Sequence, residues 1–212
     1  MLALVLTMLV VFVMLCLSEL GWRRGYMTNE IGRKFVHIMV GSFVAFWPFF
    51  LSWNQIRLLS LGFLIVVIIS KYMHLFQAIH SVQRPTYGEV FFALVVGLLT
   101  FITKSKGIYA AALLQMSVAD GMAAVVGVEY GLKWRKGCYK ILGHPKSVIG
   151  TTAFFLVSAA ILFGYSADTM RLAAGWAVVL AAGASLLENL AIAGLDNLLV
   201  PLLVAVALAH LH

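Results

Sequence analysis

An aspartate lies inside one of the long apolar runs of this chain, where a charge is costly. Asp120 interrupts the run AALLQMSVADGMAAVVG, and a carboxylate at membrane depth costs about 2.5–3.5 kcal/mol on insertion scales. Proteins usually hold Mg²⁺ with one or two carboxylates together with substrate phosphates and water. We therefore predict that Asp120 is a metal ligand and a catalytic candidate, and that Gly121 leaves the backbone clear of a bound nucleotide. A structural hydrogen bond between helices is the alternative for Asp120.

The next apolar run opens with residues suited to binding phosphate. Lys146 and Ser147 precede Gly150 and Thr151 in the order Lys-Ser-x-x-Gly-Thr. Ser147 can cap the helix, Lys146 can neutralise a phosphate, and the free amides of a helix start add donors. The order differs from that of a P-loop. We predict a phosphate-binding helix start, with an interfacial anchor as the alternative for Lys146.

Two acid–amide pairs stand near the end of the chain. Glu188-Asn189 ends one apolar run and Asp196-Asn197 begins the next. A helical hairpin would bring both pairs to the same face of the membrane. With Asp120, the carboxylates Glu188 and Asp196 are predicted to form a divalent-cation site, although helix capping is an alternative for Asp196.

Two further segments supply candidates. Arg33, Lys34 and His37 open the second apolar run, and Arg33 and His37 share a helical face because they are four residues apart. They could contact a phosphate or a substrate hydroxyl. The alternatives are cations that reach lipid headgroups and a histidine bonded to a neighbouring helix. Glu89 follows the turn RPTYG and begins an apolar run that does not otherwise need it, so His37 and Glu89 join the catalytic candidates.

The composition places these residues in a membrane protein. Of 212 residues, 63% are apolar and 11% are charged, against about 25% charged in a typical soluble domain. The mean hydropathy is +1.01, and the runs are continuously apolar, which favours helices over a barrel. We predict an all-α polytopic transmembrane bundle of seven or eight spans that forms a single domain over residues 1–212. The spans are predicted at Leu2–Leu17, Phe35–Leu51, Ile56–Ser70, Val90–Thr103, Ile108–Val128, Val148–Gly164, Leu172–Leu187 and Leu195–Leu211.

The basic residues predict the orientation of these spans. With the N-terminus outside, eleven of the fifteen lysines and arginines fall in cytoplasmic segments and four fall on the opposite face, as the positive-inside rule requires. All acidic residues except Asp168 also lie at or near the cytoplasmic side, which a shared site explains and the rule does not. We expect an integral membrane protein with an uncleaved first span and an active site on the cytoplasmic side. The formal charge of +7 then reflects topology and attraction of anionic ligands and membrane lipids, not nucleic-acid binding.

Four motifs of the chain resemble the CTP-dependent polyprenol kinase family, which includes dolichol kinases, phytol kinases and yeast-type diacylglycerol kinases. The motifs are RKFVHI, ADGMAAVVGVEYG, PKSVIGTTAFF and ENLAIAGLDNLLVP, in the family's order between Arg33 and Pro201. The resemblance implies phosphoryl transfer from CTP, with Mg²⁺, to the hydroxyl of a long-chain lipid alcohol. The chain is compact and lacks the extra N-terminal spans of eukaryotic dolichol kinases, so we expect a phytol kinase-like or prokaryotic prenol kinase.

The resemblance also suggests roles for the candidate residues. Asp120 and Asp196, with Glu188, would hold Mg²⁺. Lys146 and the amides from Ser147 to Thr151 would bind the β- and γ-phosphates, and either Asp120 or Glu89 would accept the hydroxyl proton. Trp134 and Tyr139, in the loop expected between Glu129 and Pro145, could stack on the cytosine. The predicted nucleotide-binding set is Arg33, Lys34, Gly121, Lys133, Lys146, Ser147, Gly150 and Thr151.

Two other functions also fit the sequence. A membrane cytidylyltransferase would need CTP, Mg²⁺ and a polar cytoplasmic face, and would make a CDP-lipid. A small transporter would account for intramembrane carboxylates, but it predicts polar residues across the whole bilayer depth, whereas here they gather at one face. The sequence leaves the alcohol, the general base and the oligomeric state open.

Overall fold

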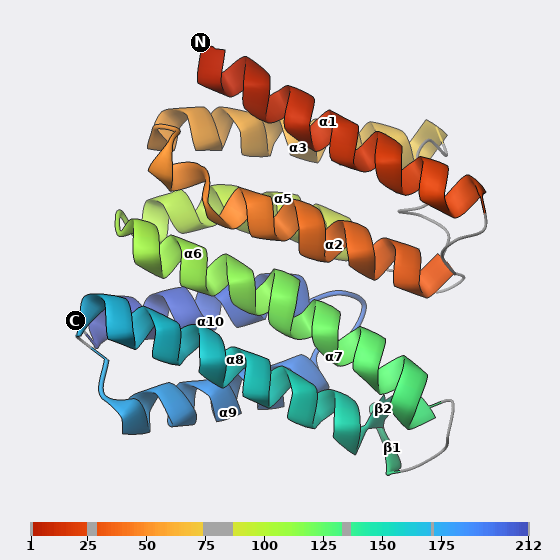
Figure 1. Ribbon diagram of the computed structural model, residues 1–212, viewed down its shortest axis with the longest axis vertical. Helices are drawn as coiled ribbons and strands as arrows, with labels where there is room; N and C mark the ends of the chain where they lie inside the picture. The colour runs from red at the N-terminus through yellow and green to blue at the C-terminus, as the bar shows by residue number, and fades with distance from the viewer. Residues whose placement is uncertain (1, 25–28, 74–86, 133–136, 171, 212) are drawn as a thin grey trace.

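The computed structural model describes residues 2–24, 29–73, 87–132, 137–170 and 172–211, which form a helical bundle (Figure 1). Short irregular elements interrupt the helices: the 3₁₀ turn η1 (Trp47–Phe49), the π-helical turns η2 (Gln115–Ala119) and η3 (Gly127–Leu132), and the strands β1 (Cys138–Ile141) and β2 (His144–Ser147). The helices are α1 (Leu2–Arg23), α2 (Asn29–Ala45), α3 (Trp53–Met73), α5 (Gly88–Ile102), α6 (Lys106–Leu114), α7 (Asp120–Val126), α8 (Val148–Thr169), α9 (Ala174–Leu190) and α10 (Asp196–His210).

The predicted all-α bundle is confirmed, and helix occupies each of the eight predicted spans in the described ranges. By length and composition, four helical segments can cross a membrane: Leu2–Gly21, Trp53–Ser70, Lys106–Gly131 and Val148–Thr169. The apolar helices Lys34–Phe49, Gly88–Ile102, Ala174–Leu190 and Asp196–His210 are shorter. One local expectation needs correction, because the segment expected to be a loop before Pro145 contains the antiparallel hairpin β1–β2.

The core of the bundle is the continuous helix formed by α6, η2, α7 and η3. It packs against α2, α8 and α10, and its Tyr109, Leu113 and Met116 are among the largest fully buried side chains. Its alanine-rich sequence lets neighbouring backbones approach closely, as membrane helices require where no hydrophobic force drives their association. Gly41 of α2 shows this closeness, since an added Cβ would lie 2.4 Å from Ser117 Cβ.

The elements that carry the predicted site residues meet at one end of the bundle. The start of α2, the end of η3, the hairpin, the start of α8, the end of α9 and the start of α10 all lie there (Figure 1). The turn η1, the α5–α6 connection and the C-terminus lie at the opposite end (Figure 1). The up-and-down order of the helices therefore gathers segments that are far apart in the sequence.

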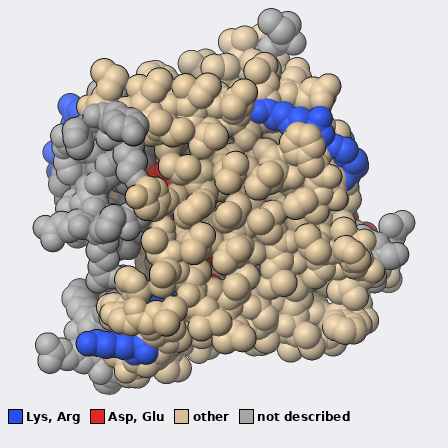
Figure 2. Space-filling view, turned by 180° about the vertical axis from the view of Figure 1, so that it is seen from behind, with Lys and Arg blue, Asp and Glu red and all other residues tan. Residues whose placement is uncertain are grey.

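The end with η1 has the features of a membrane interface. The Arg57 guanidinium lies 4.1 Å from the centroid of the Phe101 ring, and the Lys104 and Lys106 amines lie over aromatic rings at 5.5 and 5.7 Å. Aromatic rings and long cationic side chains concentrate where the hydrocarbon meets water. Between the two ends, the face seen from behind has few charged side chains (Figure 2), as expected for a surface in contact with lipid.

Candidate functional site

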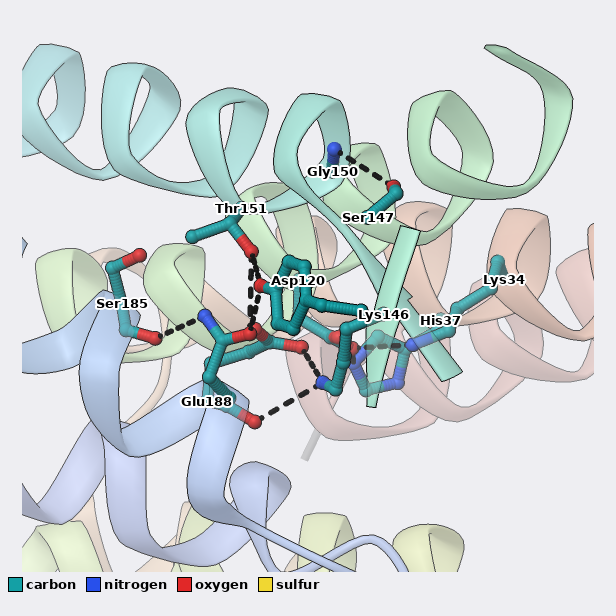
Figure 3. A network of polar contacts seen from close by, with 11 residues as sticks. Lys34, His37, Asp120, Lys146, Ser147, Gly150, Thr151, Ser185 and Glu188 are labelled. Atoms are coloured by element: carbon teal, nitrogen blue, oxygen red, sulfur yellow. Dashed lines mark hydrogen bonds and ion pairs between the residues drawn. The ribbon is translucent and has the colours of Figure 1, made fainter. Parts of the chain in front are cut away.

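A cavity of about 400 Å³ at the end with the hairpin collects most of the predicted site residues. Its volume falls in the usual range for small-molecule sites. The side chains reach it from different elements, so only the folded bundle brings them together (Figure 3). Its polar lining residues are Lys34, Asp120, Lys146, Ser147, Thr151, Glu188 and Asp196, with Gly150 at the start of α8.

Asp120 is held by a lysine from α2. Lys34 Nζ donates to Asp120 Oδ2 at 2.6 Å, and both residues are buried, with 8% and 4% exposure. His37 Nε2 lies 3.7 Å from the same oxygen and 3.0 Å from the Met116 carbonyl oxygen. Because a carbonyl only accepts, the contact with Met116 assigns the proton to Nε2. A buried charge is tolerated when it is paired and hydrogen-bonded, so Lys34 and Asp120 each balance the buried charge of the other.

The π-helical turn η2 lies directly before Asp120. A π turn widens the helix locally and is frequent at functional sites. The Ser117 hydroxyl within it donates to the Leu113 carbonyl at 2.8 Å, which satisfies a backbone group of the distorted segment. The turn therefore changes the direction of the side chains that follow it, beginning with Asp120.

A second lysine–carboxylate pair lines the same cavity. Lys146 Nζ of β2 donates to the Glu188 carboxylate and, at 3.2 Å, to the Glu188 carbonyl oxygen. Glu188 is 7% exposed and lies near the end of α9. The cavity thus contains two ammonium groups beside two carboxylates, an arrangement in which an incoming phosphate can compete for the ammonium groups.

The hairpin positions Lys146. Ile141 pairs with His144, so Leu142 and Gly143 form a two-residue loop, with φ values of 49° and 82°. Positive φ at both loop residues is the mark of a type I′ turn. Tyr139 is the register partner of Lys146 on the opposite strand, and β2 leads directly into α8.

The start of α8 is capped as predicted, but its free amides are fewer than expected. The Gly150 N–H donates to Ser147 Oγ at 3.2 Å, which confirms Ser147 as the cap. The Val148 N–H donates to the Gly137 carbonyl at 2.9 Å. Two of the amides predicted to bind phosphate are therefore already used within the protein, which shifts the expected phosphate contacts toward Lys146 and the Thr151 side chain.

A glycine seam, formed by Gly127, Gly131 and Gly150, joins η3 to the start of α8. A Cβ at Gly127 would lie 3.2 Å from Gly150 Cα, and a Cβ at Gly131 would lie 2.3 Å from Ser147 Oγ. Only glycine allows backbones to approach this closely. The seam fixes the position of Lys146 and Ser147 relative to α7, and hence to Asp120.

Hydroxyl and amide groups tie the hairpin to α8 and α9. The Tyr139 hydroxyl donates to Asn189 Oδ1 at 2.6 Å and also contacts the Thr151 hydroxyl. Thr151 Oγ1 donates to the same Asn189 oxygen at 3.2 Å, and Asn189 Nδ2 donates to the Ser185 carbonyl at 2.9 Å. The Tyr139 hydroxyl is therefore already used in hydrogen bonds within the protein.

Asp196 contributes a third carboxylate. No hydrogen bond or ion pair joins its carboxylate to another residue in the described ranges, and it interacts electrostatically with Asp120, Glu188, Lys34 and Lys146. Those ranges contain no group of three or more acidic, histidine or cysteine side chains able to hold a metal by themselves. Mg²⁺ needs only one or two carboxylates when phosphates supply further oxygens. The donor set therefore fits Mg²⁺ that arrives with a nucleotide better than a resident metal.

Several predicted residues lie elsewhere. Glu89 lines a smaller neighbouring cavity, which it shares with His37. Gly121 allows α7 to pack closely on α2, since a Cβ there would lie 2.2 Å from Ile38 Cγ1. Its role beside a bound nucleotide stays a prediction. The Arg33 side chain, Lys133 and Trp134 lie outside the described parts of the structure.

Asn197 is a site residue to which sequence reasoning gave no role. Its Nδ2 donates to the Gly88 carbonyl at 3.1 Å, while its Oδ1 is buried and has no partner in the described ranges. It lines the smaller cavity with Glu89 and His37. The acid–amide pattern marked Asn197 but led only to a role for the neighbouring acid.

The chain is 33% identical to the phytol kinase of Synechocystis sp. (strain ATCC 27184 / PCC 6803 / Kazusa), in a match that covers 87% of this chain and 81% of that protein. No family model matches the chain, and no solved structure matches it.

Proposed function

Because the chain belongs to the family of polyprenol and phytol kinases, we propose that it transfers the γ-phosphoryl group of CTP to a membrane-embedded isoprenoid alcohol. Phytol, geranylgeraniol and polyprenols of the dolichol type are the candidate acceptors, and the reaction takes place at the cytoplasmic face. The observation that carries the proposal is the single cavity that brings Lys34, Asp120, Lys146, Glu188 and Asp196 together.

The two lysines would bind the phosphates. Phosphoryl transfer depends mostly on positioning and on neutralising charge at the transferred group. Lys34 of α2 and Lys146 of β2 both line the cavity, and each donates to a carboxylate. A phosphate that binds between the two lysines replaces one anionic partner with another. The positive charge of each lysine therefore stays balanced by a negative charge. The Thr151 hydroxyl at the start of α8 adds a polar contact.

The carboxylates would hold Mg²⁺ through the nucleotide phosphates. Asp196 has no competing partner in the described ranges and is the foremost ligand candidate, with Glu188 and Asp120 beside it. When bound, the metal neutralises charge that develops on the phosphate oxygens. The protein holds Asp120 and Glu188 in place through the two lysine contacts.

Asp120 is the carboxylate best placed to take the proton of the acceptor hydroxyl. It lines the large cavity and lies beside His37, which lines the smaller one. Glu89 is confined to the smaller cavity. A carboxylate on the border between the two cavities can meet a hydroxyl on one side and a phosphate on the other.

The test uses purified protein, a panel of prenols, phytol and diacylglycerol, and CTP labelled at either the γ- or the α-phosphate. We expect γ-label in the lipid product and none from α-labelled CTP. Label transferred from the α position would identify a cytidylyltransferase and overturn the proposal, as would the absence of any labelled lipid. Repeating the assay with ATP, GTP and UTP tests the preference for CTP, which rests on the family resemblance.

A further inference from the structure

An apolar groove of about 430 Å³ runs between α1, α2 and α3, away from the polar cavity. α1 packs mainly on α2 and α3 mainly on α5, so α3 stays separate from the other two helices along the groove. Thr7 provides the one hydroxyl among the lining residues, and that hydroxyl donates to the Ala3 carbonyl at 2.7 Å. An occupant of the groove would therefore meet almost only hydrocarbon and aromatic surface.

The groove has a buried floor and an open side. Leu15, Val40, Val44 and Trp47 form the floor and are at most 8% exposed. Met8, Phe12, Leu58 and Val66 stand along the rim and are exposed. On α1 the lining runs from Leu4 to Leu15, a length of about 16 Å at about 1.5 Å per helical residue. A chain can therefore enter sideways from the bilayer and lie along the helices.

The groove adjoins the smaller cavity next to the proposed active site. The two share Leu15, Val40 and Phe63. The smaller cavity has a volume of about 60 Å³ and ends at His37, Glu89 and Asn197. That volume is enough for a hydroxyl group or a water molecule.

Two pairs of residues form the border between the smaller cavity and the phosphate cavity. His37 lines the first and lies 3.7 Å from Asp120, which lines the second. Asn197 lines the first, and its neighbour in sequence, Asp196, lines the second. A group at the end of the smaller cavity therefore lies close to residues that line the phosphate cavity.

Asn197 provides an unused acceptor at this border. The carbonyl of Gly88 can only accept, so the Asn197 atom bonded to it is the amide nitrogen, and the orientation of the side chain is fixed. This leaves Oδ1 as a buried acceptor, without a partner in the described residues, on a side chain that is 5% exposed. Burying an unsatisfied acceptor is unfavourable, and a hydroxyl donor is the group that would satisfy it.

We propose that the groove holds the hydrocarbon tail of the alcohol substrate and that the smaller cavity holds its hydroxyl. The hydroxyl donates to Asn197 Oδ1 while the alcohol is bound, and turns its proton to Asp120 as the oxygen attacks the γ-phosphate. The inference rests on the proposed kinase function and identifies where its acceptor binds. Since lipid tails surround the bundle, burial of the substrate tail gains little hydrophobic free energy. The groove therefore selects alcohols by shape and length rather than by overall affinity.

Gly62 of α3 allows a direct test. It lines the groove, and an added Cβ there meets no atom within 4 Å, so Gly62→Leu fills the groove without a clash at its first carbon. Gly164→Leu on α8 is the matched control, because Gly164 is also helical and open but lies outside the groove. For Gly62→Leu, we expect kcat/KM for phytol and geranylgeraniol to fall at least about tenfold. The value for geraniol, whose tail is shorter, should stay near that of the wild type.

The outcomes separate the groove from the kinase function. If Gly62→Leu leaves the chain-length profile unchanged, or lowers kcat/KM equally for short and long alcohols, the groove is not the tail site. If the wild type phosphorylates no alcohol, a photoreactive geranylgeraniol analogue still tests the groove. Labelling of α1 and α3 that unlabelled geranylgeraniol suppresses and phosphatidylcholine does not would support it. Labelling spread evenly over α8 and α9, or suppressed equally by phosphatidylcholine, would overturn it.

Asn197→Ala tests the hydroxyl contact. We expect the KM for the alcohol to rise about 3- to 10-fold, as for the loss of one hydrogen bond, with an unchanged KM for CTP. A purely structural role would raise both KM values and lower the unfolding temperature, and that result would contradict the contact. Asn197→Asp retains an acceptor, so its KM for the alcohol should lie between the values for the wild type and for Asn197→Ala.

Discussion

The polar cavity and the apolar groove are bordered by the same helix but are built in different ways. Lys34 of α2 lines the cavity, while Val40 and Val44, one to three turns further on, line the groove. In the cavity, both lysines and two of the carboxylates are paired before any ligand binds. The groove has no such contacts to lose. A site that handles charge must therefore be fixed in advance, whereas a site for a flexible tail can remain open.

The helices around the cavity and the groove also differ, because those around the cavity are more deeply buried. In the apolar window of α1, 11% of residues are buried, against 61% in the window that spans α6 and α7. The central helix carries Asp120 and is held on several sides by its neighbours. α1 contacts mainly one helix, so its position can adapt at lower cost than that of the core. Changes in the cavity should therefore reduce turnover, and changes in the groove should alter the choice of alcohol.

Removal of Mg²⁺ should have the largest effect. With EDTA in excess, we expect turnover to fall to background and to return when Mg²⁺ is restored, because the cavity lacks a resident metal site in the described residues. Calorimetry should show tight Mg²⁺ binding only in the presence of a non-hydrolysable CTP analogue. Tight binding to the nucleotide-free protein would instead show that the carboxylates form a metal site on their own.

Asp120→Asn should lower turnover by at least about 100-fold, as when a group that stabilises a transition state is removed. It keeps the size of the side chain but removes the charge that Lys34 compensates. The double variant Lys34→Met/Asp120→Asn should restore stability without restoring activity, as measured by unfolding in detergent and by turnover. Glu89→Gln makes the same change in the smaller cavity, where we expect a smaller loss of turnover. An equal loss there would transfer the role of proton acceptor to Glu89.

Lys146→Ala should raise the KM for CTP far more than the KM for the alcohol. A hydrogen bond to a charged group contributes about 1.5–3 kcal/mol, which corresponds to about 10- to 150-fold. Lys140→Ala is the control, because Lys140 is exposed on the same hairpin and outside the cavity. An equal rise in both KM values would exclude Lys146 as a specific phosphate ligand.

Tyr139→Phe should have the smallest effect. It removes the hydroxyl that connects the hairpin to Asn189 and Thr151, at a cost of about 0.5–1.5 kcal/mol per hydrogen bond. We expect a lower midpoint of thermal unfolding and an activity within about threefold of the wild type. Tyr130→Phe, at a tyrosine that is 59% exposed, should change neither. A fall in activity with CTP that is larger than the fall with other nucleotides would show that Tyr139 also contacts the base.

The sequence predicts the depth of a residue in the membrane better than the direction in which its side chain points around the helix. Apolar runs located the helices, and an acid or amine at the end of a run could be assigned to one end of the bundle. The pairing of Lys34 with Asp120 depends on how α2 is rotated against α7, which contacts such as that between Ile38 and Gly121 determine. Glu89 shows the same limit, because it lies at the predicted end but lines the neighbouring cavity.

Local signals succeeded where the interaction itself is local. Ser147 was predicted to cap α8 because a cap involves residues only three positions apart. The hairpin escaped prediction because Leu142, with φ of 49°, occupies a turn position where glycine, asparagine or aspartate is usual. The free oxygen of Asn197 depends on Gly88, more than a hundred residues earlier, and no local pattern reveals such a contact.

The glycine seam between η3 and α8 makes activity sensitive to substitution at residues that no substrate needs to contact. One extra methyl group at Gly131 would collide with Ser147, and one at Gly127 would press on Gly150. The clash at Gly131 would displace Ser147 and, with it, the neighbouring lysine of β2. Random mutagenesis should therefore yield inactive proteins from alanine at Gly131 as readily as from losses among the charged residues, although glycine itself takes no part in the chemistry.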